Sequence, residues 1–141
     1  MSEIVNASFG FSSYKILNFS FNEPKESSEN ISLFFEPSGI YDETNGEFCL
    51  TLIFQAKEND NDNFIITSKI QAVFRFSEAH DFEELPSFFY KNSIAIVFPY
   101  LRAFIGSLTI QANVVPIMIP ILNLSSIESD FKANVVVKKR N

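Results

Sequence analysis

The chain has 141 residues, of which 46% are hydrophobic and 20% charged, and its formal net charge is −6. This length suits one domain with a sizeable core, and the apolar fraction is too high for a disordered chain. The acidic balance argues against a nucleic-acid partner, and a single Cys and a single His exclude a disulfide framework and a typical structural zinc site.

Phenylalanine is the unusual feature of the composition, because it occurs 17 times in a chain that has no Trp and only four Gly. A Phe ring adds a large apolar area with no polar group, so the chain carries more ring surface than one small core normally uses. We therefore expect part of this surface to be covered by self-association or to form an exposed binding surface.

The first two predicted strands come from alternating apolar and polar residues. The first is one long strand over Phe9–Phe21, and a bulge near Ile16–Leu17 reconciles the change of apolar parity within it. The second is short: it begins at Ile31 and is expected to stop at Pro37-Ser38-Gly39. The polar stretch Lys25–Asn30 is the loop between them.

The third and fourth predicted strands have the clearest pattern. Apolar residues alternate with polar ones over Phe48–Ala56 and again over Phe64–Phe76. This pattern predicts a sheet that is buried on one face and partly wet on the other. Residues 57–63 lie between the two strands. They are rich in Asp and Asn but lack the glycine and closing Glu of a calcium loop, so we expect a hairpin loop.

Helical spacing begins after Ser77. A short helix is expected over Glu83–Lys91, and a longer one is expected to start at Pro99 and to reach Asn113. One face of the longer helix carries apolar residues, namely Leu101, Phe104, Ile105, Leu108 and Ala112. A second stripe is small or apolar: Tyr100, Ala103, Ser107 and Ile110. Because a helix with so few charges is normally covered on more than one side, we predict that the second stripe contacts another subunit.

The last part of the chain is an extended, proline-containing return over Ile117–Leu124, followed by a short helix. The capping box Ser125-Ser126-Ile127-Glu128 predicts the start of that helix. The basic end Lys138-Lys139-Arg140-Asn141 is expected to be a solvated terminus or to contact an acidic partner. We therefore divide the chain into a single domain, residues 1–134, and a basic C-terminal tail, residues 135–141.

Nothing in the sequence predicts catalysis, a cofactor or a metal. His80-Asp81 lies in a polar loop, where a surface histidine is expected. Cys49 lies in the middle of a strand and is expected to be a small buried or interface residue. The N-terminus lacks a basic region followed by an apolar stretch, and the longest apolar run, Val114–Leu122, is half the length of a membrane span. These features predict a cytoplasmic protein that does not insert into membranes.

The segment Phe98-Pro99-Tyr100-x-Arg102 is followed by a Pro-rich return and by Leu122-Asn123-Leu124. This order is similar to the helix start, and the segment after it, of the SecB-like family of protein-export chaperones. Phe19-Ser20-Phe21-Asn22-Glu23-Pro24 and Val73-Phe74-Arg75-Phe76 resemble two of its strand ends. The motifs follow the family's order over residues 9 to 128.

The resemblance implies an α+β fold in which a four-stranded antiparallel sheet is followed by a long helix packed on it and a short C-terminal helix. It also implies a homotetramer, formed as a dimer of dimers through the long helices. The implied function is that of an ATP-independent chaperone, a holdase, which binds unfolded or preprotein clients in apolar grooves, as in protein export. The residues we expect to bind clients are Phe34, Phe35, Tyr41, Phe11 and Tyr14.

The chain differs from the family pattern at three places. The loop between the first two strands has no aromatic residue, and the acidic, zinc-contacting tail of the family has no counterpart. The positions that align with the family's acidic docking residues for the translocase motor are Asn18, Asn22 and Thr67, none of them charged. These differences favour the holdase role over docking to the motor.

Other hypotheses remain open at this stage. The chain could be a dedicated chaperone of one client such as an antitoxin, or a structural or scaffolding oligomer without clients. A small enzyme of hot-dog type is disfavoured, because there the helix comes early in the chain and because no acid–base pair is present.

Overall fold

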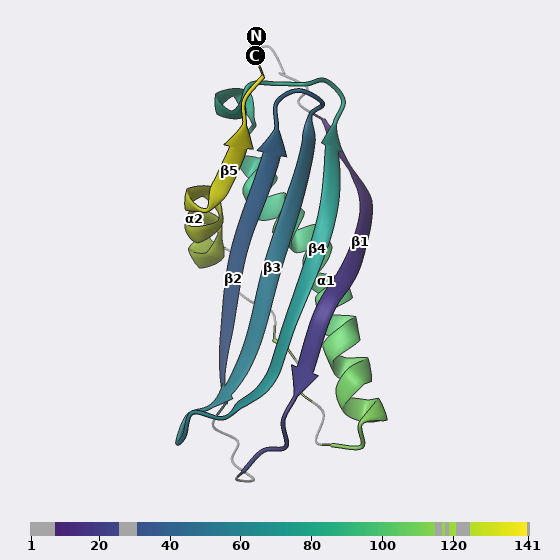
Figure 1. Cartoon of the computed structure of the whole chain (residues 1–141), viewed down its shortest axis with the longest axis vertical. Coiled ribbons are helices and arrows are strands. Elements are labelled where there is room, and N and C mark those ends of the chain that lie inside the picture. Colours follow the sequence, from purple (N-terminus) through teal and green to yellow (C-terminus); the bar gives the residue numbers. More distant parts are fainter. Residues whose placement is uncertain (1–7, 26–30, 115–116, 118, 121–124, 141) are drawn as a thin grey trace.

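A computed structural model describes residues 8–25, 31–114, 117, 119–120 and 125–140 of the chain (Figure 1). The elements in chain order are β1 (Phe9–Phe21), β2 (Ile31–Asp42), β3 (Glu47–Glu58), β4 (Phe64–Phe76), the 3-10 helix η1 (Phe82–Glu84), α1 (Phe88–Gln111), α2 (Ser125–Ala133) and β5 (Val135–Lys138). The segment Leu122-Asn123-Leu124 and residues 26–30 of the expected loop lie outside the described residues.

The strands form one sheet in the order β1-β4-β3-β2-β5. All neighbours are antiparallel except β5, which runs parallel to β2. The helix α1 crosses one face of the sheet diagonally, and its C-terminal half lies beside β1 at the sheet edge (Figure 1). We call this the inner face of the sheet, and the opposite one the outer face. The expected α+β fold is confirmed, with a fifth strand added to the expected four.

The predicted strands β1, β3 and β4 are confirmed. The register of β1 against β4 shifts between Ile16 and Asn18, which is the predicted bulge, and shifts again between Phe11 and Ser13. Period-two burial along β3 follows the alternation of its sequence, with every second side chain buried. This agreement is expected where one face of a sheet is covered and the other is not.

The predicted end of β2 at Pro37 is wrong, because the strand continues to Asp42. The backbone N–H of Gly39 donates to the carbonyl of Asn134, on the side away from β3. Pro37 lies two residues earlier in the strand, so its nitrogen points to the same side, beyond the end of β5. There the missing N–H removes no bond from the ladder with β3, and a proline is tolerated.

The predicted helix start at Pro99 is also wrong, because Pro99 lies inside α1. The helix already begins at Phe88, and the expected short helix over Glu83–Lys91 is the η1 turn followed by the first residues of α1. Buried residues on both sides of Pro99, such as Val97 and Leu101, place one continuous helical face on the sheet. Burial of that face outweighs the local cost of a proline.

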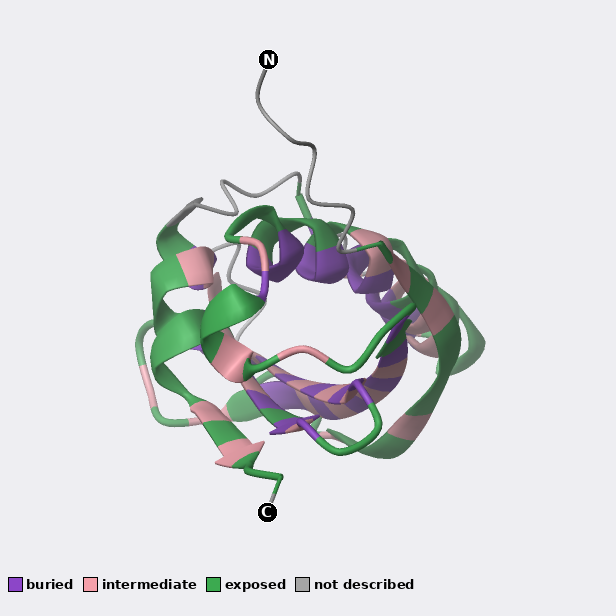
Figure 2. Cartoon of the chain, turned by 90° about the horizontal axis from the view of Figure 1, so that it is seen from above, coloured by how far each residue is buried: buried purple, intermediate pink, exposed green. Residues whose placement is uncertain are grey.

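The core lies between the inner face of the sheet and α1, which turns its buried side inward (Figure 2). Phe89 occupies the centre of an aromatic cluster. Its ring centroid is 4.7–5.7 Å from those of five other rings, namely Phe9, Phe48, Phe74, Phe76 and Tyr90. Full burial of one such side chain contributes about 1.5–3 kcal/mol, so this cluster is a principal source of stability.

The helix α2 and the strand β5 close one end of this core. Phe131 of α2 is fully buried and lies edge-on to Phe48, with a centroid distance of 5.6 Å. A Cβ at Gly39 would lie 2.5 Å from a ring carbon of Phe48, so only glycine fits beneath that ring. The predicted helix start at Ser125 is confirmed. Val135–Lys138, with which the expected C-terminal tail begins, form the edge strand β5. Lys138, Lys139 and Arg140 of the expected basic end are exposed.

Candidate functional site

Five of the ten large apolar side chains that are exposed among the described residues lie on β1 and on the C-terminal half of α1. Those two elements supply Tyr14, Leu17, Phe19, Tyr100 and Ile110, and the exposed fractions reach 54% at Phe19 and 65% at Ile110. Because α1 crosses the sheet diagonally, this half of the helix lies beside an edge strand instead of under the middle of the sheet (Figure 1). The side chains between these two elements are therefore covered from one side only.

Ring contacts join these two elements into one surface. We name it the β1–α1 aromatic surface, and it consists of Phe11, Tyr14, Phe19, Tyr100 and Phe104. The centroids of Tyr14 and Tyr100 are 4.4 Å apart, and those of Phe19 and Phe104 are 5.3 Å apart. Two residues predicted to bind clients, Phe11 and Tyr14, thus contact a residue predicted to lie at a subunit interface, Tyr100. The sequence patterns place them on different surfaces, whereas the fold brings them onto one.

The second stripe of α1 is uncovered in the part of the chain that the structure describes. Ala103, Ser107 and Ile110 are exposed along the side of the helix that carries Tyr100. Ala112, which the pattern placed on the buried face, is exposed because it lies beyond the last helical residue. The helix therefore packs one face on the sheet and leaves a low-charge face open.

The three predicted client-binding residues of β2 have different environments. Phe34 is 49% exposed, and its register partner Gln55 belongs to the outer face of the sheet. Phe35 points to the inner face, is half-buried, and contacts the rings of Phe54 and Phe98. Phe34 thus offers a ring on the outer face, whereas Phe35 mostly fills the core.

The prediction that Tyr41 is exposed is wrong, because the residue is fully buried. Its hydroxyl donates to the backbone carbonyl of His80 at 2.6 Å, and burial raises the pKa of this phenol. The error arises from the predicted end of β2, since a strand that continues to Asp42 carries Tyr41 onto the inner face. A buried tyrosine whose hydroxyl is bonded to backbone holds the connection after β4 in place.

A polar cluster at the closed end of the core was not predicted. The carboxylate of Glu43 is almost completely buried and accepts a hydrogen bond from the backbone N–H of Phe82 at 2.7 Å. The ammonium of Lys139 lies 3.5 Å from Glu43 and 3.2 Å from Glu83. Arg140 Nε donates to Asp81 Oδ1 at 3.1 Å. The ion pairs join residues more than 50 positions apart in the chain, so no local pattern could show them.

The basic residues of this cluster lower the pKa values of two of its carboxyl groups. The hydrogen bond from Arg140 is the main cause that lowers the pKa of the Asp81 carboxyl. The pKa of Glu83 is lowered first by its own backbone amide and then by Lys139. His80, expected at the surface, is half-buried, and its Nε2 atom is buried with no hydrogen-bond partner among the described residues. Within the same residues, no group of three or more His, Cys, Asp or Glu could hold a metal ion.

The outer face of the sheet carries the positions that align with the family's docking residues. Asn18 pairs with Lys69, and Thr67 pairs with Ser20. The side-chain amide of Asn22 donates to the backbone carbonyl of Phe64 at 3.0 Å. Cys49 is half-buried on this face, and its thiol pKa is raised mainly by burial and also by Glu47. These positions form no acidic patch.

By length and composition alone, α1 is the one helix of the described residues that could cross a membrane. A helix that packs on a sheet in a protein core meets the same criteria, and the inward side of α1 does pack on this sheet.

Comparisons with known proteins agree with this architecture. The family model of the preprotein translocase subunit SecB matches residues 15–133. Among solved structures, the fold is similar to that of the Mycobacterium tuberculosis SecB-like chaperone Rv1957 in complex with a ChAD peptide from the HigA1 antitoxin. The TM-score is 0.66 at 20% identity, and the match covers 82% of this chain and 88% of that one.

Two further relatives have no assigned function. A protein of unknown function from Streptococcus agalactiae has a TM-score of 0.51 at 10% identity, over 81% of this chain and 98% of that one. The uncharacterized protein MJ0357 of Methanocaldococcus jannaschii is 38% identical over 50 residues, which are 36% of this chain. The match covers only 30% of that curated relative's length.

Proposed function

The chain belongs to the SecB family, and we propose that it is an ATP-independent chaperone that holds unfolded polypeptides on exposed apolar surface. The observation that carries this proposal is the β1–α1 aromatic surface, where rings stay exposed although the core is already rich in rings. Burial of apolar client side chains contributes about 25 cal/mol per Å² and needs no particular geometry. A surface of this kind therefore suits many sequences of unfolded chain.

We further propose that the protein assembles, as a dimer of dimers, through the uncovered side of α1. Tyr100, Ala103, Ser107 and Ile110 form a low-charge face whose small residues permit close approach of a second helix. The strand β1 has a neighbour on one side only in the part of the chain that the structure describes, so its free edge is a second surface for contact between copies. Phe11 and Tyr14 are then the proposed client contacts next to these interfaces. Phe34 is a proposed client contact on the outer face of β2, and Phe35 lies on the inner face of the same strand.

A client-dedicated role is favoured over docking to a translocase motor. The outer-face positions Asn18 and Thr67 are uncharged, and Lys69 lies opposite Asn18, so this face lacks the acidic character that the family resemblance implies for motor docking. The similar chaperone from M. tuberculosis was solved with a peptide of one antitoxin. We propose that one protein is the main natural client of this chain, although the surface also holds other unfolded chains. We also propose a cytoplasmic location and no catalytic activity.

The test is suppression of aggregation. A chemically denatured model protein is diluted into buffer that contains no nucleotide, and its light scattering is followed with the chaperone at one tetramer per client. Wild type is expected to suppress the scattering. Tyr14→Asp is expected to need roughly tenfold more protein, a loss of about 1.4 kcal/mol in client affinity.

The matched control is Asn18→Asp, which adds the same charge to the same strand at an exposed polar position. This variant is expected to behave as wild type. If wild type leaves the scattering unchanged and binds no unfolded peptide at micromolar concentration, the chaperone proposal is wrong and a scaffolding oligomer is the better description. Equal loss in both variants would show that the aromatic surface is not the client site.

A further inference from the structure

The strand β5 occupies only part of the free edge of β2. It pairs with Gly39–Asp42, whereas residues Ile31–Ser38 of β2 have no strand partner on that edge among the described residues. Backbone hydrogen bonds fix both ends of the short ladder. Gly39 donates to the carbonyl of Asn134 at 3.1 Å, and Glu43 donates to the carbonyl of Lys138 at 3.0 Å.

The side chains of β5 contribute little burial. Val135 and Val137 are half-buried at the inner face, and Val136 is 64% exposed on the outer face. A strand of four residues with no fully buried side chain depends on its backbone bonds and on the contacts of the neighbouring residues Lys139 and Arg140. It is therefore one of the parts of the fold that can open locally without loss of the core.

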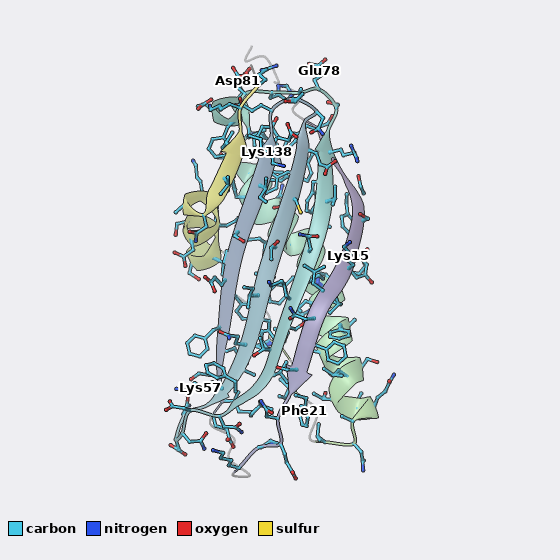
Figure 3. The ribbon with its side chains drawn as sticks, in the orientation of Figure 1. Lys15, Phe21, Lys57, Glu78, Asp81 and Lys138 are labelled. Carbon is cyan, nitrogen blue, oxygen red and sulfur yellow. The ribbon has the colours of Figure 1, made fainter. Side chains whose placement is uncertain are left out.

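An acidic cluster lies where β5 ends. Glu43 follows β2, whereas Asp81 is the N-cap of η1 and Glu83 lies within η1, so two segments contribute the three carboxylates. Lys139 lies between Glu43 and Glu83, and Arg140 binds Asp81. Asp81 and Lys138 are found at the same end of the molecule (Figure 3). A nearly buried carboxylate such as Glu43 needs a cationic or hydrogen-bonding partner. The cluster is therefore expected to bind basic side chains.

We propose that this edge of β2 and the acidic cluster form a docking site for extended segments in which β-branched residues precede Lys or Arg. β5 and the residues after it fill the site as an internal, displaceable ligand. The inference rests on the proposed function, because it takes the natural occupants to be polypeptide clients. Beyond that function, the docking site would determine which client segments bind preferentially and when they gain access to the edge of β2.

The strand β5 competes with external segments for the edge of β2. Its effective concentration is high, because it is tethered to the site through α2. An external segment therefore gains access only when the ion pairs of Lys139 and Arg140 are weakened, as in a variant that lacks these two charges. An occupant that is longer than β5 at its N-terminal end would lie along the open edge of β2 next to Phe34, with one ladder hydrogen bond missing at Pro37. This continuity makes the site an extension of the proposed client surface.

The experiment measures binding of a labelled peptide with the sequence of residues 134–141 to the full-length protein by fluorescence anisotropy. The double variant Lys139→Gln/Arg140→Gln weakens the internal ligand but leaves the acidic cluster intact. We expect it to bind the peptide at least about tenfold more tightly than wild type, and we expect added salt to weaken that binding. The control variant Lys91→Gln, at an exposed position of α1, is expected to bind as wild type does.

Two control peptides separate strand docking from simple charge attraction. One replaces its three basic residues by Gln, and the other carries Pro in place of the residue equivalent to Val136, which prevents pairing along the strand. Neither is expected to bind the double variant. Equal binding of the proline peptide, or equal affinity of wild type and double variant for the basic peptide, would overturn the proposal.

A second measurement covers the case in which the double variant does not fold. Hydrogen exchange at the amides of Gly39 and Glu43 in wild type is expected to accelerate with increasing salt, while amides in the centre of β3 stay protected. Unchanged exchange at both amides up to about 1 M salt would also overturn the proposal. Failure of wild type to suppress aggregation, with peptide binding as expected, would instead refute the chaperone proposal and leave the docking site standing.

Discussion

The two halves of α1 carry similar aromatic residues but use them differently. In the first half, Phe89 and Tyr90 are buried among other rings, and burial raises the pKa of Tyr90 to about 12. In the second half, Tyr100 stays exposed and contacts the rings of Phe11 and Tyr14 at the surface. Residue type therefore does not decide which rings form the core.

The position of each half in the fold explains the difference. The first half lies beneath the middle of the sheet, and α2 and β5 close its end through Phe131. The second half lies beside the edge strand β1, and the described residues place no further element over it (Figure 1). The surplus of phenylalanine is thus divided into a closed cluster that stabilises the chain and an open surface that is available to other chains.

The contrast between the two halves of α1 is tested most strongly by removing one ring from the aromatic cluster around Phe89. Phe89→Ala is expected to lower the free energy of unfolding by about 3–5 kcal/mol, because it leaves a cavity among five rings. The neighbouring residue Phe88 is 51% exposed, so Phe88→Ala is the matched control and should change the free energy by less than about 0.5 kcal/mol. Denaturant unfolding of both variants measures the contrast. Similar losses in the two would show that the first half of α1 is not a closed core.

The open half is tested by adding a charge to it. Ile110→Glu is expected to leave the fold of one chain intact, because the side chain is 65% exposed there. In the assembly the new carboxylate would be buried without a partner, which is expected to weaken association by about 3 kcal/mol, roughly a hundredfold. Light scattering coupled to size exclusion measures the mass, with Asn92→Glu as the control at an exposed position in the first half of α1. A wild type that is already monomeric would contradict this account of α1.

The parts of the fold that sequence could predict are those where one local pattern dominates. Burial alternates along β3 and, from Ile66 onward, along β4. The parity change of β1 predicts a bulge where the register does shift after Ile16. Prolines misled the prediction twice. Pro37 lies on a strand edge where no N–H is needed. Pro99 lies in a helix whose burial on the sheet outweighs the energetic cost of the proline. Neither the open edge nor the burial can be recognised from the sequence before the neighbouring elements are placed.

The candidate site could be predicted only in part for the same reason. Phe11, Tyr14 and Tyr100 can each be identified from the sequence, but their contact depends on the diagonal path of α1 across the sheet. Tyr41 was misplaced at the surface because the predicted β2 ends too early. The run Val135–Val137 is too short to show a period, so its place in the sheet depends on a parallel pairing with distant residues of β2, such as Val135 with Gly39.

The smallest expected effect concerns the ion pairs that hold β5 over the closed end. The pKa of Asp81 is lowered from its ordinary value of 3.8, chiefly by Arg140. The pKa of Glu83 is lowered from its ordinary value of 4.5 by its own backbone amide and by Lys139. A carboxyl with a lowered pKa in the folded state stabilises that state above its ordinary pKa. It loses this contribution as the pH falls through the lowered value. We therefore expect β5 to loosen below about pH 4, before the core does.

Amide resonances of β5 and of β3, followed together during an acid titration, measure this difference. Those of β5 are expected to shift first, and Arg140→Gln is expected to move their transition to higher pH, because Asp81 loses its main partner. The shift should be small, since both side chains of that pair are largely in solvent and such pairs contribute little. If β5 and β3 change together in both proteins, the closed end is a single cooperative unit, and β5 is as firmly part of the core as the rings beneath it.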